Sequence, residues 1–236
     1  MKINDYYDQL NTRSQEIFSL AQKEPELMSK VHSSAAELFQ LSEAIFDLDE
    51  QSMLRVVCSQ LESSCLSLSL GLYRPAIGAL RLALELGIGS IYFSANKMAH
   101  REWISGNGDL KWSVVNSETD GVFSNRFIKA FYPELIEHSA TYLARASRVY
   151  RILSEYVHGN SDTWDQSGIA LQVNEKLRKF YELEFTEVAV LIKFAFCCRH
   201  LKEMSPETLE SNQVILTELD YIPQIREFLG GPKEIV

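Results

Sequence analysis

One apolar segment constrains the fold more than any other part of the chain. It reads "PAIGALRLALELGIGSIYF", residues 75–93, and Arg81 and Glu85 are its only charged residues. Small residues recur along it at steps of three and four, at Ala76, Ala79, Ala83 and Gly87. This spacing places them in one stripe of a helix, where a second backbone can approach closely. A helix that is apolar almost all round lies at the centre of a bundle, and two central charges argue against a membrane span.

Helical periodicity also dominates the rest of the sequence. Glycine (11) and proline (6) are scarce, which disfavours an all-β fold rich in tight turns. The sequence therefore predicts an all-α helical bundle, with residues 1–236 in a single domain and a helical C-terminal extension over about 206–236. The expected helices span residues 3–22, 26–47, about 50–71, a fourth from Pro75, about 133–158, and 174 to about 204.

Cap signals and breaks mark the ends of these helices. Asp47 and Asp49 are both candidate N-caps of the third helix, and Ser205 is the expected N-cap of the C-terminal extension. Asp109 is a candidate cap for a short helix through Val115, and Pro223 predicts a break in the tail. Residues 96–122 are the least regular part, and a short extended piece is possible at 169–173.

Charge and cysteine content narrow the functional classes. A formal net charge of -9 disfavours a general nucleic-acid coat, although residues 123–158 carry five basic and three acidic side chains. Cys58 and Cys65 lie seven apart on one helix face and are interpreted as small core residues. No cysteine or histidine motif has the spacing of metal ligands, so no metal or other cofactor is predicted. The polar N-terminus lacks a signal-peptide core, and a reducing cytoplasmic location is expected.

The segment "VYRILSEYVHGN", residues 149–160, holds the main candidates for chemistry. Arg151 and His158 are seven apart, which places them within about 20° of each other on a helix and roughly 10 Å apart along its axis. The same face carries further polar residues, namely Arg145, Arg148, Ser154 and Glu155. One interpretation is a solvated face with an Arg151–Glu155 pair and a histidine that favours the helix C-terminus. The other is a functional site, to which Asn160 would contribute unless it only caps the loop.

The charged pair of the apolar segment also has two interpretations. Arg81 and Glu85 are four apart, so they can neutralise each other inside the bundle. Alternatively, they face the Arg151/His158 stripe and orient it. The remaining histidines, His32, His100, His138 and His200, have no partner at catalytic or ligand spacing and are expected to be structural or exposed. The tryptophans are expected to plug the bundle ends rather than to stack on bases, and they are Trp103, Trp112 and Trp164.

Three segments together resemble the HEPN superfamily of helical bundles, in its abortive-infection-type branch. They are "ALRLALELGIGSIYF", "REWISGNGDLKW" and "YRILSEYVHGN", and the similarity covers roughly residues 30–205. The positions that match the pattern of that family are Arg81, Glu85, Tyr150, Arg151, Ser154 and His158.

The resemblance implies a metal-independent ribonuclease that serves as a toxin or phage-defence effector. Arg151 and His158 would be the catalytic residues, and a homodimer would assemble a composite site. Arg145 and Arg148 would then contact RNA. The family has a polar residue after the arginine, whereas this chain has Ile152. That departure favours the alternative, a catalytically silent module that binds a nucleotide or a protein such as an antitoxin. A third option is a small-molecule pocket around Arg81 and Glu85.

Overall fold

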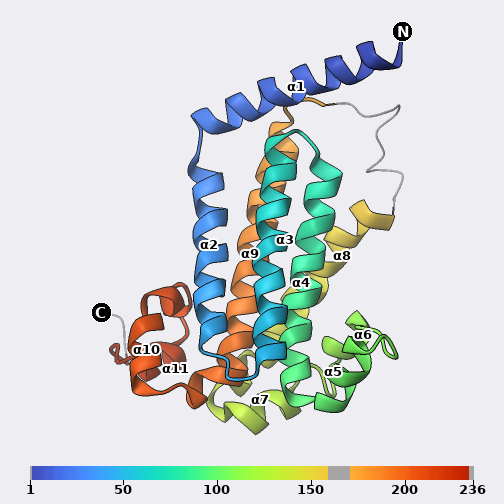
Figure 1. The fold of residues 1–236 in the computed structure, drawn as a ribbon. Helices are drawn as coiled ribbons and strands as arrows, with labels where there is room; N and C mark the ends of the chain where they lie inside the picture. Colours follow the sequence, from blue (N-terminus) through green and yellow to red (C-terminus); the bar gives the residue numbers. More distant parts are fainter. Residues whose placement is uncertain (1, 159–170, 234–236) are drawn as a thin grey trace.

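Five long helices run alternately up and down and form the body of the protein (Figure 1). The computed structural model describes residues 2–158 and 171–233. Within those residues the regular structure is helical throughout, with no strand, and the predicted all-α bundle is confirmed. The five helices are α2 (Glu26–Glu43), α3 (Leu48–Ser69), α4 (Tyr73–Ala95), α8 (Ser139–His158) and α9 (Glu175–His200).

Other helices cover the two ends of this bundle. Helix α1 (Ile3–Lys23) crosses the end at which α3 passes into α4 (Figure 1). The opposite end carries α5 (Lys97–Ile104), α6 (Trp112–Val115), α7 (Asn125–Phe131) and the 3-10 helix η1 (Pro133–His138). The C-terminal extension gathers beside that same end, as η3 (Leu201–Glu203), α10 (Pro206–Asn212), η4 (Val214–Leu219) and α11 (Pro223–Phe228).

Helix α4 occupies the central position predicted for the apolar segment, because it packs against α3, α8 and α9. Gly87 shows why small residues are needed there. A β-carbon at Gly87 would lie 2.6 Å from Ile192 Cγ1 of α9, so the glycine permits the close approach of these two helices. Leu80, Leu84 and Ile88 are fully buried on the same helix. By length and composition α4 would also suffice to cross a membrane, but 61% of its most apolar stretch is buried inside the protein.

Of the two candidate caps of α3, Asp47 is the N-cap and Asp49 lies within the first turn, and the predicted cap at Ser205 is confirmed. Asp47 Oδ1 accepts hydrogen bonds from the backbone N–H groups of Asp49 and Glu50, and Ser205 Oγ accepts one from Thr208. These side chains satisfy backbone donors that have no partner within the first helical turn. All four cysteines are buried with unpaired thiols, as the core interpretation of Cys58 and Cys65 requires.

Several element ends differ from the sequence prediction. Helix α2 ends at Glu43, not at 47, because the chain must leave the helix for Asp47 to cap α3. The helix expected over 133–158 begins as the 3-10 helix η1 and becomes α-helical only at Ser139. Pro133 at its start has no N–H to donate. Asp109 is not the cap of α6, which begins after Lys111. Residues 171–173 are not a strand, while 169 and 170 lie outside the described residues.

Candidate functional site on helix α8

Helix α8 is held between α4 and α9 by one apolar face. Tyr142, Ala146, Val149 and Leu153 are its buried core residues, at the three- and four-residue steps of a helix face. At the C-terminal end of α8, Arg74 of α4 donates two hydrogen bonds to the backbone oxygen of Tyr156, at 2.8 and 3.1 Å. These contacts fix the rotation of α8, and that rotation decides which of its polar residues face solvent.

The Arg81–Glu85 pair lies at the α4–α8 contact. Arg81 Nη2 donates to Glu85 Oε1 at 3.0 Å and to Tyr150 Oη at 2.6 Å. The guanidinium carbon also lies 4.7 Å from the centroid of the Tyr150 ring, which suits a cation–π contact. The structure therefore brings Arg81, Glu85 and Tyr150 together, as one supporting group of the predicted site.

Trp112 completes this group from outside the bundle. Its ring stacks on Tyr150 with centroids 4.2 Å apart and planes 4° apart. The Arg81 side chain is only 14% exposed, and its Nε has no hydrogen-bond partner among the described residues. Pairing with Glu85 and Tyr150 offsets much of the cost of burying this charge. Arg81 contacts Tyr150, the residue that precedes Arg151 in the sequence. The Arg81–Glu85 pair therefore contacts α8 through this tyrosine.

Arg145 and Arg148 are both paired with acidic residues of α9. Arg145 donates two hydrogen bonds to Glu187, each at 3.1 Å, and Arg148 donates two to Glu184, at 2.9 and 3.3 Å. Such two-point contacts are the strong geometry of an arginine and a carboxylate. The basic stripe predicted from the sequence is thus largely neutralised within one chain, a fact that the spacing on α8 alone did not reveal.

Arg151 and His158 are placed differently from those two arginines. Both are exposed at the last turns of α8, and within residues 2–158 and 171–233 neither makes a hydrogen bond or an ion pair. Glu155 is exposed on the same part of the helix, and Ser154 Oγ donates to the backbone oxygen of Tyr150 at 2.6 Å. Asn160 lies outside the described residues, as do Gly159 and Trp164.

Helix α8 therefore has one set of polar residues that bind neighbouring helices and another set that face solvent. Tyr150, Arg145 and Arg148 tie the helix to its neighbours, while the Arg151 and His158 side chains are directed into solvent. A guanidinium can bind phosphate oxygens, and an imidazole can transfer a proton near neutral pH. Among the described residues, no three His, Cys, Asp or Glu side chains come together to hold a metal ion.

The partners that sequence reasoning missed lie on other elements. Trp112 was interpreted as a plug for the bundle end, and Glu184 and Glu187 were not singled out. A signal for the two glutamates did exist, because they are three residues apart on α9, as Arg145 and Arg148 are on α8.

Comparison with known proteins adds no relative to this description, since no protein-family model, curated protein or solved structure matches the chain.

Proposed function

We propose that the protein is a HEPN-like, metal-independent endoribonuclease that acts as a homodimer through Arg151 and His158. One observation carries the proposal. On a helix whose other arginines are held by glutamates of α9, Arg151 and His158 are exposed and make no hydrogen bond or ion pair within the described residues. Their exposure leaves both side chains accessible to a substrate or to a second chain.

The chemistry of these two groups suits phosphodiester cleavage. His158 as general base would take the proton of a ribose 2′-hydroxyl, and the resulting oxygen would attack the adjacent phosphorus. The bond to the 5′-oxygen of the next nucleotide then breaks, and that oxygen receives a proton. The products are a 2′,3′-cyclic phosphate and a 5′-hydroxyl. Arg151 would donate two hydrogen bonds to the phosphorane oxygens, where negative charge increases in the transition state.

A second copy of the chain would complete this site. One histidine cannot be protonated and unprotonated at once, so the base and the acid need two groups. A twofold axis beside α8 would bring His158 of a partner opposite the first, and a symmetric dimer is the commonest oligomer. Arg145 and Arg148 would contact RNA through the guanidinium N–H groups that do not bind Glu187 or Glu184.

The test is cleavage of a labelled single-stranded RNA in the presence of EDTA. We expect products with 2′,3′-cyclic phosphate ends from the native protein, and a loss of about 10²–10⁴-fold in rate for His158→Ala, the usual contribution of a general acid–base group. His32→Ala is the matched control, because His32 is also exposed and its one ion pair among the described residues is with Glu62, on another part of the surface. Cleavage that persists unchanged in His158→Ala would exclude the proposal.

A second function is favoured by a different observation. Glu184 and Glu187 neutralise Arg148 and Arg145, and the chain carries a net charge of -9, so an isolated subunit has little affinity for RNA phosphates. The paired arginines and the negative charge are compatible with a HEPN-like binding module whose contact surface is the exposed end of α8. It predicts no cleavage at micromolar protein, together with a protein or nucleotide partner whose binding is abolished by Arg151→Glu. Metal-free cleavage by the native protein would rule this module out.

A further inference from the structure

A polar pocket lies at the end of the bundle opposite to His158, where three chain junctions meet. It forms where α2 passes into α3, α4 into α5, and α9 into η3 (Figure 1). Its volume is about 280 Å³, which is sufficient for a small organic molecule. The lining residues are Ala44, Ile45, Phe46, Asp47, Glu50, Lys97, Arg199, His200 and Glu203.

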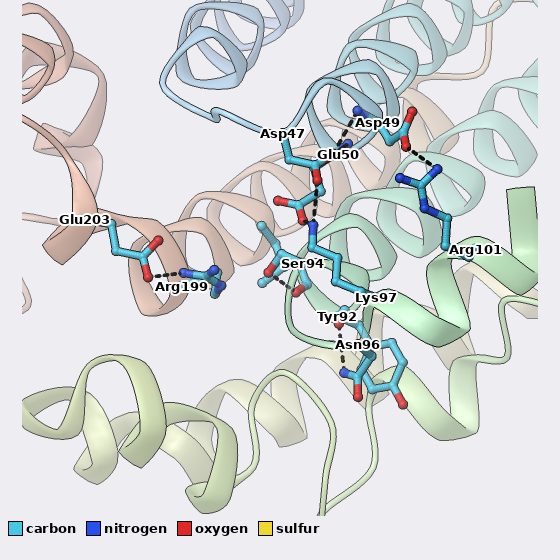
Figure 2. Close-up of polar contacts among 11 residues, drawn as sticks. Asp47, Asp49, Glu50, Tyr92, Ser94, Asn96, Lys97, Arg101, Arg199 and Glu203 are labelled. Atoms are coloured by element: carbon cyan, nitrogen blue, oxygen red, sulfur yellow. Dashed lines mark hydrogen bonds and ion pairs between the residues drawn. The ribbon is translucent and has the colours of Figure 1, made fainter.

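One wall of the pocket is built around Lys97. Lys97 Nζ donates to Asp47 Oδ2 at 2.9 Å and to Glu50 Oε1 (Figure 2). The Glu50 side chain is only 5% exposed. The hydrogen bond from Lys97 holds the pKa of Asp47 below its ordinary value, so this carboxylate stays ionised. Two carboxylates against one ammonium leave this wall with an excess negative charge.

The opposite wall presents donors that lack partners. Arg199 Nη1 forms an ion pair with Glu203 Oε1 at 2.6 Å (Figure 2), but among the described residues neither Nη1 nor the buried Nε of Arg199 makes a hydrogen bond of good geometry. His200 is 7% exposed, and its Nε2 also has no hydrogen-bond partner among the described residues. Burial lowers the pKa of His200 to about 3, so the ring is neutral, and Nε2 donates an N–H in the tautomer that carries the proton there. Buried polar groups are rarely left unpaired, and these two belong to adjacent residues of the pocket wall. The atoms themselves are shielded from solvent, so a ligand can reach them only when a covering side chain moves aside.

We propose that this pocket binds a small zwitterion of the α-amino-acid class. The carboxylate of the ligand accepts hydrogen bonds from Arg199 and His200, and it displaces Glu203, which is 59% exposed and therefore free to swing into solvent. The ammonium of the ligand donates to Asp47 of the Lys97 wall.

Charge selects this class over other anions. The five charged side chains of the lining sum to -1, which opposes a dianion such as a phosphate monoester. A zwitterion instead places one charge against each wall. Phe46 is fully exposed at the rim, where it offers apolar contact to the side chain of the ligand.

The experiment is thermal unfolding of the full chain with three matched probes at about 10 mM: L-alanine, propionate and ethylamine, followed by the other amino acids. We expect at least one amino acid to raise Tm by about 3–6 °C when its concentration is ten times Kd. Propionate, which lacks the ammonium, and ethylamine, which lacks the carboxylate, should give no comparable rise. No shift with any amino acid, or an equal shift with propionate, would overturn the proposal.

Variants test whether the rise in Tm comes from binding in this pocket. Arg199→Lys keeps the charge but removes the two-point donor, so the shift should disappear. Arg101→Gln is the control, because Arg101 pairs with Asp49 outside the pocket and is 75% exposed, and its shift should persist. A retained shift in Arg199→Lys would contradict the assignment.

If Arg199→Lys does not fold, a second variant tests the same proposal. Glu203→Gln alters a half-exposed side chain and removes the carboxylate that competes with the ligand for Arg199, so it should increase the Tm shift with L-alanine at a fixed concentration. An unchanged or smaller shift would contradict the displacement of Glu203 by the ligand carboxylate. All these Tm shifts measure ligand binding to the pocket, so their outcome does not depend on RNA cleavage at α8.

Discussion

Arg81 of α4 and Tyr150 of α8 are joined twice, by a 2.6 Å hydrogen bond from Nη2 to Oη and by the guanidinium lying over the tyrosine ring. The two residues are 69 positions apart in sequence. Their contact sets how α8 lies on α4, and Arg151 is the next residue along. The contact therefore links the buried charge of the central helix to the exposed end of α8.

We expect Tyr150→Phe to lower stability by about 1–2 kcal/mol, because a hydrogen bond to a buried charged group is lost while the ring contact stays. For a chain of this size the loss corresponds to a fall in Tm of about 2–8 °C. Tyr92→Phe is the matched control, since the Tyr92 hydroxyl makes no hydrogen bond within the described residues. Equal values of Tm for the two variants would show that the Arg81–Tyr150 bond contributes nothing.

Gly87 and Gly78 lie on the same helix, and we expect alanine substitutions at them to have opposite effects. A β-carbon at Gly87 would lie 2.6 Å from Ile192 Cγ1, so Gly87→Ala should destabilise the protein by about 1–3 kcal/mol. A β-carbon at Gly78 would meet only Val157 Cγ2, at an ordinary 3.8 Å. Gly78→Ala should therefore stabilise α4 by about 0.5–1 kcal/mol, as alanine does within helices.

Urea unfolding measures both glycine variants. In Gly87→Ala/Ile192→Val, valine lacks the Cδ1 atom that would lie 2.7 Å from the new β-carbon but keeps the γ-carbons, so the double variant should cost less than the sum of the two single variants. If Gly87→Ala proved as stable as the native protein, the close packing of α4 on α9 would be wrong.

The bundle was predictable from sequence because its signals are local. Apolar residues at three- and four-residue steps, caps such as Asp47, and few glycines and prolines all act within a few residues of each other. The errors occur where tertiary context decides, as at Pro133, where the first helical turns are 3-10 in geometry. The internal Arg81–Glu85 pair was also predictable, since helix geometry places residues four apart side by side.

The site was less predictable, because its partners come from different helices. Spacing on α8 placed Arg145, Arg148, Arg151 and His158 on one face, but it gave no means of knowing that α9 pairs the first two and not the last two. Burial of the histidines is likewise a tertiary property. His200 and the exposed His158 both stand at the last turn of a helix, and nothing local distinguishes them.

Lys193 provides a test of a buried ion cluster that ties the C-terminal extension to the bundle. Its Nζ is fully buried and donates to Glu37 Oε2 of α2 at 2.6 Å and to Glu218 Oε2 of η4 at 2.8 Å. Glu37→Gln/Glu218→Gln leaves a buried ammonium without a compensating charge, and we expect a loss of about 3–5 kcal/mol. Lys193→Met should cost less, because both carboxylates are partly exposed and water can solvate them.

The free energy of unfolding in urea measures these variants. Glu134→Gln is the control, because it removes the exposed partner of Lys202 and should cost under about 1 kcal/mol. The double glutamine variant should lose more stability than Lys193→Met, because it leaves the buried ammonium uncompensated. A larger loss of stability for Lys193→Met would contradict this explanation.

His200 should make the stability of the protein depend on pH. Burial, with the nearby charges of Arg199 and Lys97, lowers the pKa of this imidazole from an ordinary 6.5 to about 3 in the folded state. Between these two values the unfolded chain binds a proton that the folded chain does not. Stability is therefore lost as pH falls from 6.5 towards 3, and this group contributes no pH dependence above 6.5.

At pH 5 the expected loss from His200 is about 2 kcal/mol relative to pH 7.5, since each pKa unit corresponds to about 1.4 kcal/mol. We expect His200→Gln, which cannot titrate, to lose about 2 kcal/mol less than the native protein over this range, whatever its stability at pH 7.5. His32→Gln, at an exposed histidine, should not show this reduced loss. Denaturant unfolding at the two pH values measures the difference, and equal losses for native protein and His200→Gln would mean that His200 is not held neutral by burial.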